Sequence, residues 1–290
     1  IEKTGIQRRY IAAPEDSAPD YAVNTAQHAL AMAKITANDI DLIIVCTFSG
    51  DYIFPPLSAK VQMELKAIHA QIFDLQANCT GFLTGLTVAS DRMKIDSSVR
   101  HALVIGVELC SRYIDRTDVN TAIYLSDGAG AAVLSHIDTD FGIQSSAFHT
   151  DSSNYEAVRM RGGGSSFPMH GRQFDPAIDL MEMNGIATWK QAITHLPKVV
   201  RKACEKSKVD LATVDFFIFH QANLRLIEYI IKKMGFDISK TYTNVQEIGN
   251  TGSASLAIAI SEAVTKGLLK NGDLLILAAV GAGFNFGASV

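Results

Sequence analysis

The sequence lacks any long apolar run. Its strongest candidate, residues 274–280, has the length of a strand, whereas a membrane-spanning helix needs about 20 mostly apolar residues. Charged residues and a turn stand where a signal peptide would begin. We therefore expect a cytoplasmic protein without a membrane segment. Because the chain starts at Ile1 and stops inside a strand-like stretch, residues 287–290, we also expect it to omit an N-terminal piece.

Clusters of basic residues are also missing. The chain has 26 Lys and Arg against 30 Asp and Glu, and its net charge is −4. Nucleic acids and anionic membranes are bound through clustered basic side chains that release counterions, so we expect neither as a partner. With 48% hydrophobic and 19% charged residues, the composition is that of a soluble protein with a sizeable core, in one large domain or two fused ones.

Cysteine is scarce and scattered. The four cysteines, at 46, 79, 110 and 204, form no CxxC pair. This spacing argues against a disulfide framework or a metal site and is typical of a reducing cytoplasm. Any cysteine chemistry should therefore involve a single thiol.

Three pairs of similar segments occur in the same order at a nearly constant offset. They are residues 34–45 and 208–219, residues 78–81 and 249–252, and residues 101–108 and 272–280. Each pair is weak alone, but together they indicate a duplicated α/β unit. We expect an N-terminal half of residues 1–145 and a C-terminal half of residues 146–290. In the second pair, Cys79 and Asn250 occupy equivalent positions.

The expected strands are continuous apolar runs, which favour sheets covered on both faces. The helices between them give a βαβ rhythm. They are expected at residues 21–34, 55–65, 82–94, 186–206, 224–234 and 255–269. Those after Cys79 and Asn250 are rich in small residues, which suits burial at the centre of five layers. The Gly-rich residues 149–171 are expected to form a loop or linker between the halves.

Three residues stand where chemistry is expected. Cys79 lies between a strand and a helix, where the helix dipole and free N–H groups favour the thiolate. His220 ends an apolar strand, and strand ends are where α/β sheets place ligands. Asn250 is the repeat partner of Cys79, so the three side chains should meet in one pocket. The alternatives are a buried structural cysteine, a structural histidine and an Asn that caps a helix.

Two glycine-rich segments have different meanings. Residues 127–131 share part of a dinucleotide-binding motif, but they lack its full spacing and lead into a strand, so a nucleotide site is not expected. Residues 281–284 follow a strand, and such a turn can direct a backbone N–H at a developing oxyanion.

Five motifs together resemble one known family. They are residues 77–82 (ANCTGF), 126–131 (SDGAGA), 220–225 (HQANLR), 249–251 (GNT) and 281–284 (GAGF). In this order they cover essentially the whole chain and resemble β-ketoacyl-acyl-carrier-protein synthase III. The resemblance implies a homodimer with the thiolase fold, made of duplicated βαβ halves in a five-layered αβαβα sandwich. It also implies a strand and a helix ahead of Ile1.

The resemblance further implies a ping-pong Claisen condensation. Cys79 would take an acyl group from acyl-CoA or an acyl carrier protein, with the backbone N–H groups of Cys79 and Ala282 holding the oxyanion. His220 and Asn250 would then stabilise the negative charge that builds as a malonyl thioester loses CO2. CoA and phosphopantetheine thioesters are the substrates, and no metal or cofactor is required.

Other positions match the family's binding surfaces. Phe54 matches an aromatic residue that crosses the dimer interface into the acyl pocket, where Cys110 also lies. Trp189 and Asn223 match the pantetheine tunnel. A basic face would receive the carrier protein or CoA, although an ordinary solvated helix face has the same composition. Its residues are Lys190, Arg225, Lys232 and Lys233.

Two departures leave alternatives open. Lys3 and Val119 stand where the family usually has arginines that hold the CoA adenine, so the acyl donor could instead be carrier-bound, as in secondary metabolism. One alternative is a non-decarboxylating acyltransferase with an O, N or S acceptor. A second is a thioester hydrolase or papain-like Cys-His-Asn hydrolase, and a third is a non-catalytic scaffold.

Overall fold

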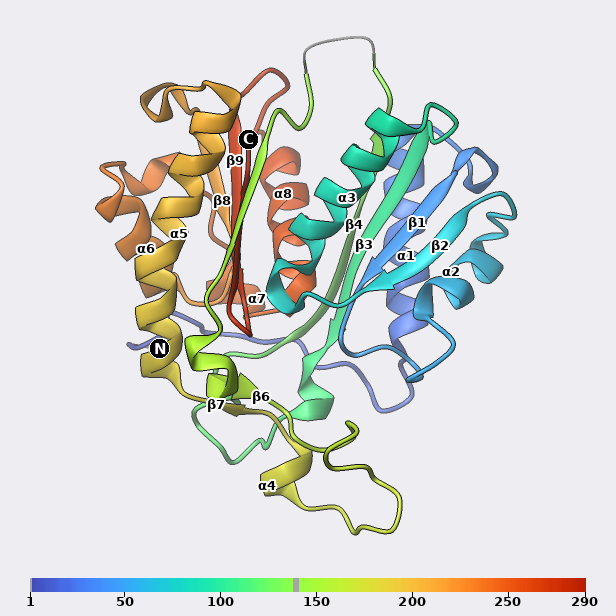
Figure 1. Cartoon of the computed structure of the whole chain (residues 1–290), viewed down its shortest axis with the longest axis vertical. Helices are drawn as coiled ribbons and strands as arrows, with labels where there is room; N and C mark the ends of the chain where they lie inside the picture. Colours follow the sequence, from blue (N-terminus) through green and yellow to red (C-terminus); the bar gives the residue numbers. More distant parts are fainter. Residues whose placement is uncertain (1, 138–140) are drawn as a thin grey trace.

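The computed structural model describes residues 2–137 and 141–290. Two four-stranded sheets lie face to face with a layer of helices between them. A further helical layer covers the outer face of each sheet, which makes five layers in all (Figure 1). The predicted αβαβα sandwich of duplicated halves is therefore confirmed.

The N-terminal half forms the first sheet and its outer helices. Their bounds are α1 Ala18–Ala33, β1 Leu42–Cys46, α2 Leu57–Leu65, β2 Gln71–Leu75, β3 His101–Leu109 and β4 Asp127–Ser135. The strand order is β2-β1-β3-β4, in which only β4 runs antiparallel to its neighbour. Every residue of β1 is buried, because helices cover both faces of the sheet, as its unbroken apolar sequence predicts.

The C-terminal half forms the second sheet. Its main elements are β5 Ser146–Thr150, α5 Gly185–Ser207, β8 Phe216–Phe219, α6 Leu224–Lys233, β9 Leu275–Gly281 and β10 Asn285–Ser289. The strand order is β5-β10-β9-β8, with β8 and β9 parallel and the other pairs antiparallel. α5 packs on this sheet and against α6 as the outer layer.

Small residues allow the two central helices, α3 (Gly81–Ile95) and α8 (Ser255–Thr265), to approach the sheets closely. A Cβ atom on Gly85 of α3 would lie 2.6 Å from Sγ of Cys46 in β1. Ala257 of α8 packs closely on β4, since a Cβ atom on Gly130 would lie 2.7 Å from the Cβ atom of Ala257. The glycines of residues 127–131 therefore allow the C-terminal half to pack closely on β4.

Matching hydrogen bonds confirm the sequence repeat. Lys34 ends α1 and Lys208 ends α5, both in the left-handed conformation, with φ of 57° and 58°. The carboxylate of Asp41 accepts from the backbone N–H of His101 at 3.0 Å, next to the neighbouring strand. Asp215 accepts from the N–H of Leu274 at 2.9 Å in the same way. Each half therefore has the same left-handed helix end, followed by an Asp side chain that accepts from the backbone of the neighbouring segment.

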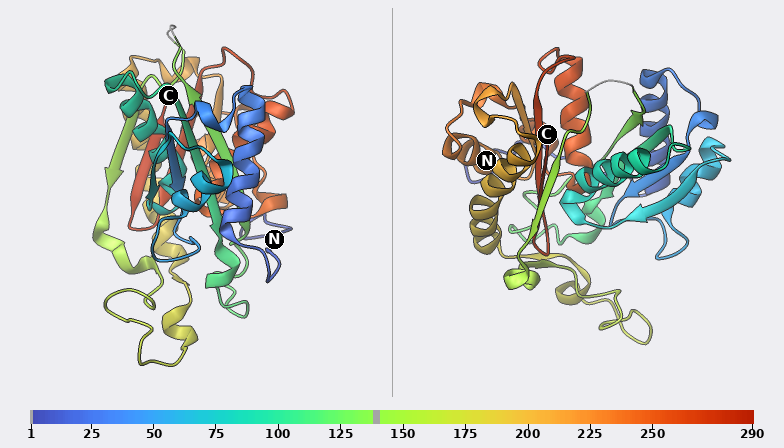
Figure 2. Two further views of the ribbon diagram at one scale, coloured as in Figure 1. Left: turned by 90° about the vertical axis from the view of Figure 1, so that its right-hand side faces the viewer. Right: turned by 45° about the horizontal axis from the view of Figure 1, so that its top comes forward.

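Residues 149–171 contain more structure than the predicted loop. η4 (Ser152–Ala157) leads into β6 (Val158–Arg159), which pairs with β7 (Glu182–Met183). An ion pair of 2.5 Å between Arg159 and Glu182 ties the two short strands together. The chain between them, with α4 (Pro176–Asp179), extends away from the layers (Figures 1 and 2). The loop prediction was wrong at these points because the pairing joins residues far apart in the sequence.

Several one-turn elements shape the ends of the sheets. They are η1 Ala37–Asp39, η2 Asn78–Thr80, η3 Cys110–Tyr113, η5 Leu211–Thr213, η6 Ile238–Lys240, α7 Val245–Ile248 and η7 Gly252–Ala254. Among the described residues, no helix combines the length and the apolar character that crossing a bilayer demands.

Candidate active site

Cys79 lies in a tight turn between β2 and α3. It is the middle residue of η2, whose first residue, Asn78, is in the left-handed conformation (φ 50°). The turn is closed by an N–H donation from Thr80 to the Ala77 carbonyl oxygen at 3.2 Å. Nδ2 of Asn78 donates to the carbonyl oxygen of Ala282 at 3.1 Å. A side chain of the N-terminal half thus ties the cysteine turn to the C-terminal half.

The loop after β9 packs directly on this turn. A Cβ on Gly281 would lie 2.8 Å from the carbonyl oxygen of Ala77 and 3.1 Å from the backbone nitrogen of Thr80. Only glycine therefore allows the end of β9 to meet the turn this closely. As a result, the backbone of Ala282 lies beside Cys79, where the sequence predicted an oxyanion site.

The thiol of Cys79 is protonated in the resting site. Burial raises the pKa of Cys79 to about 12, and the Glu108 carboxylate acts in the same direction. The residue's own backbone N–H lowers the pKa, but by less. Loss of water around the sulfur therefore opposes the thiolate that the helix dipole was predicted to favour.

His220 is neutral and held from one side. It follows β8, and its backbone N–H donates to the Ala278 carbonyl oxygen at 2.8 Å. Its Nδ1 lies 2.5 Å from Oγ of Ser255, which also accepts from the backbone N–H of Gln221 at 3.3 Å. Burial lowers the pKa of His220 to about 4. Within residues 2–137 and 141–290, Nε2 has no hydrogen-bond partner, so this nitrogen is available to a substrate.

Asn250 is held by three hydrogen bonds. Its backbone N–H donates to the carbonyl oxygen of Tyr124 at 2.9 Å, and its carbonyl oxygen accepts from the N–H of Ser126 at 2.8 Å. Its side-chain Oδ1 accepts from the N–H of Gly252 at 3.0 Å. Nδ2 has no acceptor in the described part of the chain. Because Oδ1 is held by Gly252, the side-chain amide is fixed in orientation and Nδ2 remains available as a donor.

Contacts between short elements link the surroundings of these residues. η2, which holds Cys79, packs against η7, which begins two residues after Asn250. η7 leads directly into Ser255, the partner of His220. The starts of α3 and α8 lie at the same end of the central layer (Figure 1). The structure thus gathers the elements that carry all three predicted residues.

Glu108, which the sequence analysis did not single out, lies next to this site. It is fully buried near the end of β3 and accepts from Oγ of Ser49 at 2.6 Å and from Oγ1 of Thr47 at 3.2 Å. The N–H of Phe48 lies 3.3 Å from the same carboxylate. Burial raises the pKa of Glu108 to about 7. The sequence signal that could have identified Glu108 was an acidic residue near the end of a mostly apolar strand.

The two predicted acyl-pocket residues have opposite environments. Phe54 lies between β1 and α2 with 83% of its surface exposed, beside the equally exposed Ile53. Within one protomer it therefore lines no enclosed pocket. Cys110 is fully buried in η3, where burial raises its pKa and the nearby Glu108 carboxylate acts in the same direction.

The two predicted tunnel residues lie on α5 and just before α6. The half-buried Trp189 ring lies 5.8 Å from the ring of Tyr229. Asn223 is buried and caps α6, since its Oδ1 accepts from the N–H of Arg225 at 2.8 Å. Its Nδ2 donates to the carbonyl oxygen of Lys3 at 3.3 Å. Asn223 thus fastens the start of the chain to this helix.

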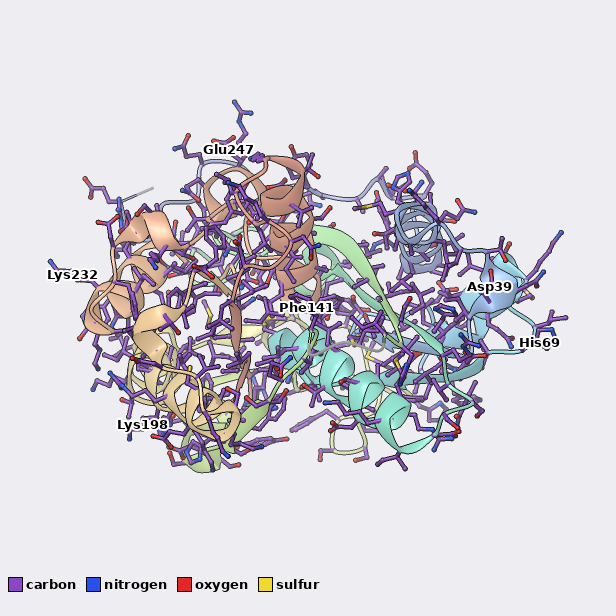
Figure 3. The ribbon with its side chains drawn as sticks, turned by 90° about the horizontal axis from the view of Figure 1, so that it is seen from above. Asp39, His69, Phe141, Lys198, Lys232 and Glu247 are labelled. Atoms are coloured by element: carbon purple, nitrogen blue, oxygen red, sulfur yellow. The ribbon has the colours of Figure 1, made fainter. Side chains whose placement is uncertain are left out.

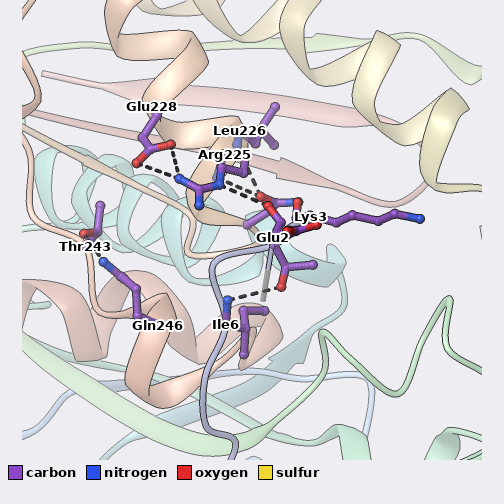
Figure 4. A network of polar contacts seen from close by, with 10 residues as sticks. Glu2, Lys3, Ile6, Arg225, Leu226, Glu228, Thr243 and Gln246 are labelled. Carbon is purple, nitrogen blue, oxygen red and sulfur yellow. Dashed lines mark hydrogen bonds and ion pairs between the residues drawn. The ribbon is translucent and has the colours of Figure 1, made fainter.

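The predicted basic face is exposed but partly neutralised. Arg225 donates to the carboxylate of Glu228 at 3.0 Å and to the carbonyl oxygen of Glu2 (Figure 4). Lys233 donates to the Ile193 carbonyl oxygen at 2.9 Å. Lys232 points outward from α6 (Figure 3), and Lys190 is exposed on α5. The face therefore spans both outer helices of the second sheet.

No group of three or more His, Cys, Asp or Glu side chains in the described ranges is arranged to hold a metal ion. The three predicted residues offer a thiol, an imidazole and an amide. These groups suit acyl transfer through a single sulfur.

Two stacked α/β units with a cysteine at the start of one central helix and an asparagine at the start of the other define the thiolase class of condensing enzymes. Comparison with known proteins agrees. Residues 73–152 match the family 3-oxoacyl-[acyl-carrier-protein (ACP)] synthase III, and residues 204–290 match its C-terminal region.

Individual relatives extend the match over the whole chain. The β-ketoacyl-[acyl-carrier-protein] synthase III of Paramagnetospirillum magneticum is 37% identical, with 100% of this chain and 88% of the relative covered. The crystal structure of 3-oxoacyl-[acyl-carrier-protein] synthase III from Aquifex aeolicus has a TM-score of 0.91 at 32% identity, covering 99% and 88%. The priming β-ketosynthase of the R1128 polyketide pathway has a TM-score of 0.92 at 30% identity, covering 99% and 85%.

The chain belongs to the β-ketoacyl-[acyl-carrier-protein] synthase III family. It is an acyl-transferring condensing enzyme.

Proposed function

We propose that Cys79, His220 and Asn250 carry out a two-step condensation. Cys79 takes an acyl group from a thioester, and a malonyl thioester then loses CO2 and attacks this acyl group to give a β-ketoacyl product. One observation carries the proposal: Nε2 of His220 and Nδ2 of Asn250 are free, while the other polar atoms of both side chains are held by protein groups. Two pre-oriented neutral groups suit a developing enolate.

In the first step, the Cys79 sulfur bonds to the acyl carbon and the carbon–sulfur bond of the donor thioester breaks. Because the thiol is protonated at neutral pH, its proton must leave during attack. His220 is neutral and accepts this proton on Nε2, then passes it to the departing thiolate. The hydroxyl of Ser255 can donate or accept, so it supports either tautomer of the imidazole.

The oxyanion of each tetrahedral intermediate would be held by the backbone N–H groups of Cys79 and Ala282. The close packing of Gly281 on the cysteine turn supports this role, because it fixes the two backbone segments side by side. Fixed N–H groups need no reorganisation as the charge forms.

In the second step, His220 would carry its proton on Nε2 while Nδ1 accepts from the Ser255 hydroxyl, and Nε2 of His220 and Nδ2 of Asn250 would donate to the thioester carbonyl oxygen of the malonyl group. The carboxylate leaves as CO2, its electron pair forms the enolate, and the enolate carbon attacks the acyl carbon on Cys79. The sulfur of Cys79 is the leaving group and regains a proton. No metal or organic cofactor takes part in these steps.

We infer a homodimer from the exposed apolar loop between β1 and α2. Tyr52, Ile53 and Phe54 are 69%, 91% and 83% exposed, which is unfavourable for three adjacent large apolar residues in water. Phe54 would enter the acyl pocket of the partner subunit, which Cys110 helps to line.

The expected cytoplasmic location is consistent with four free cysteines.

The substrate arm would enter between α5 and α6. Trp189 and Asn223 would line the pantetheine tunnel, and an acidic carrier protein would dock on the basic face, Lys190, Arg225, Lys232 and Lys233. Lys3 and the exposed Val119 leave a carrier-bound acyl donor as well as acyl-CoA open.

We also propose a boundary between the two halves near residue 145. It is supported by β4, which ends the first sheet at Ser135, and by β5, which begins in the second sheet at Ser146.

Mass spectrometry of the intact protein after incubation with acyl-CoA and acyl-carrier donors tests the first step. We expect the acyl mass on the wild type and no acyl mass on Cys79→Ala. Malonyl carrier protein labelled in its free carboxyl group tests the second step. We expect Asn250→Ala to load acyl groups but to release no labelled CO2, whereas the exposed-residue control Asn120→Ala does both. Decarboxylation at the wild-type rate by Asn250→Ala would remove its proposed role.

The same assay separates the alternatives. A product formed without CO2 would indicate acyl transfer to an O, N or S acceptor. Free acid as the only product would indicate a thioester hydrolase, and failure to load any donor would indicate a scaffold.

A further inference from the structure

The buried Glu108 side chain is held by donors from the N-terminal half and packs against the C-terminal half. Hydroxyl groups of Ser49 and Thr47 and the N–H of Phe48 donate from the segment after β1. From the C-terminal half, the turn that contains Ser253 is tied to the end of β1, because its hydroxyl donates to the Cys46 carbonyl oxygen at 2.7 Å. The carboxylate is therefore fixed by hydrogen bonds from the segment after β1, and it presents a fixed surface to the C-terminal half.

The segment on the C-terminal side is the turn that carries Asn250. A Cβ on Gly252 would lie 2.9 Å from Cγ of Glu108, so the backbone of this turn rests directly on the Glu108 side chain. Gly252 also has a φ of +55°, and its N–H is the group that holds Oδ1 of Asn250 at 3.0 Å. The contact chain therefore runs from the carboxylate through Gly252 to the amide of Asn250.

We propose that Glu108 is a positioning residue for the second half-reaction, which fixes the turn of Gly252 and Ser253 so that Nδ2 of Asn250 faces the substrate. This inference rests on the proposed function of Asn250. Cys79 is held by a different set of contacts, with Asn78, Ala282 and Gly281. Loss of the Glu108 carboxylate should therefore separate the two half-reactions.

Glu108→Gln is the sharpest variant because it keeps the shape and removes both the charge and one acceptor atom. Its amide would present N–H groups to the donors of residues 47–49 that now point at the carboxylate, so the side chain on which Gly252 rests would shift. At the same time, the negative charge that opposes ionisation of Cys79 disappears. The variant should thus load acyl groups at least as fast as the wild type.

The experiment measures acyl loading by mass spectrometry and decarboxylation of malonyl carrier protein in the same full-length preparations. For Glu108→Gln we expect unchanged or faster loading together with a loss of decarboxylation of about tenfold or more, the size expected for a misplaced donor. Glu108→Asp, which keeps the acceptor, should recover part of the decarboxylation. A structural collapse would instead lower both activities.

Ionisation of Glu108 should also give the wild-type decarboxylation rate a pH-dependent step that the Glu108→Gln variant lacks. The carboxylate is the form that accepts from all its donors, so the rate should rise through about pH 7 and this step should be absent in Glu108→Gln. The facing thiols and phenol are protonated across this range because their pKa values are raised, and Asp127 on β4 stays tied to Ser111 and Ala12. The thiols and the phenol that face Glu108 belong to Cys46, Cys79, Cys110 and Tyr113.

Asn250→Ala distinguishes failure of this inference from failure of the proposed function. If Asn250→Ala loses decarboxylation and Glu108→Gln keeps it, Glu108 does not position Asn250. Equal losses of loading and decarboxylation in Glu108→Gln would likewise overturn the inference. If Asn250→Ala itself decarboxylates normally, the assignment of Asn250 fails first.

Discussion

Cys79 and His220 are both uncharged at neutral pH, and they are so for the same physical reason. Burial removes the water that would solvate a thiolate or an imidazolium, which raises the pKa of the thiol and lowers that of the imidazole. The nucleophile and the imidazole therefore carry no charge before a substrate arrives. Negative charge appears only during reaction, when the N–H donors described above can meet it.

Alkylation of Cys79 should show its raised pKa directly. Because only the thiolate reacts, the rate of modification by iodoacetamide should rise about tenfold for each pH unit between about pH 7 and pH 10. Mass spectrometry of tryptic peptides would follow Cys79 against the other cysteines. A rate that levels off near pH 7 would mean that the thiolate is already formed in the resting enzyme.

Glu108 should make folding stability depend on pH. Its pKa is raised from 4.5 to about 7 in the folded protein, so the folded state holds this proton more tightly than the unfolded state. The stabilisation is present at low pH and is lost as the pH rises from about 4.5 through about 7. Relative to Glu108→Gln, the wild type should lose up to about 3 kcal/mol of unfolding free energy between about pH 4 and pH 8.

Urea unfolding of both proteins at several pH values measures this difference. The constant cost of the altered hydrogen bonds in Glu108→Gln cancels when the two pH values are compared. A difference between the proteins that does not change with pH would contradict the raised pKa of Glu108.

At the scale of elements, small residues decide how closely the central helices pack. The sequence predicted both helices and their small-residue character, and α3 and α8 begin within one residue of the predicted starts at 82 and 255. The reason is local, since helix periodicity and composition are readable in one segment. α8 ends at Thr265, before the predicted 269, because Gly267 adopts a left-handed conformation.

Gly130→Ala should test the packing of α8 on β4. The added Cβ would meet the Cβ of Ala257 at 2.7 Å and the backbone nitrogen of Ile258 at 3.1 Å, and neither atom can move without shifting the helix. We expect a loss of about 1–3 kcal/mol in unfolding free energy. Gly164→Ala is the control, because nothing lies within 4 Å of its Cβ position. Similar urea midpoints for the two variants would show that α8 tolerates the displacement.

At the scale of the whole molecule, the second half completes what the first half begins. Asn78 and Gly281 join the cysteine turn to β9, and Glu108 joins the segment after β1 to η7. Neither half alone contains the cysteine and its two proposed partners. The exposed loop that carries Ile53 and Phe54 is the surface at which we propose that a second subunit binds.

Ile53→Asp should weaken self-association. A charge placed on this 91% exposed residue would have to be buried in the proposed interface, which is costly. We expect the wild type to sediment as a dimer and the variant to shift toward the monomer in analytical ultracentrifugation. Ile95→Asp, on an 87% exposed isoleucine at the end of α3, is the matched control and should not shift. A dimer that is equally stable in both variants would place the interface elsewhere.

The sequence by itself determined the duplicated fold and singled out Cys79, His220 and Asn250, because a repeated pattern and residues at strand and helix ends are local features. The tertiary structure decided that the Cys79 thiol is protonated, that Glu108 supports the turn after Asn250, and that β6 pairs with β7. These properties depend on desolvation and on partners far away in the chain. Only packing brings such groups together, so local patterns do not encode them.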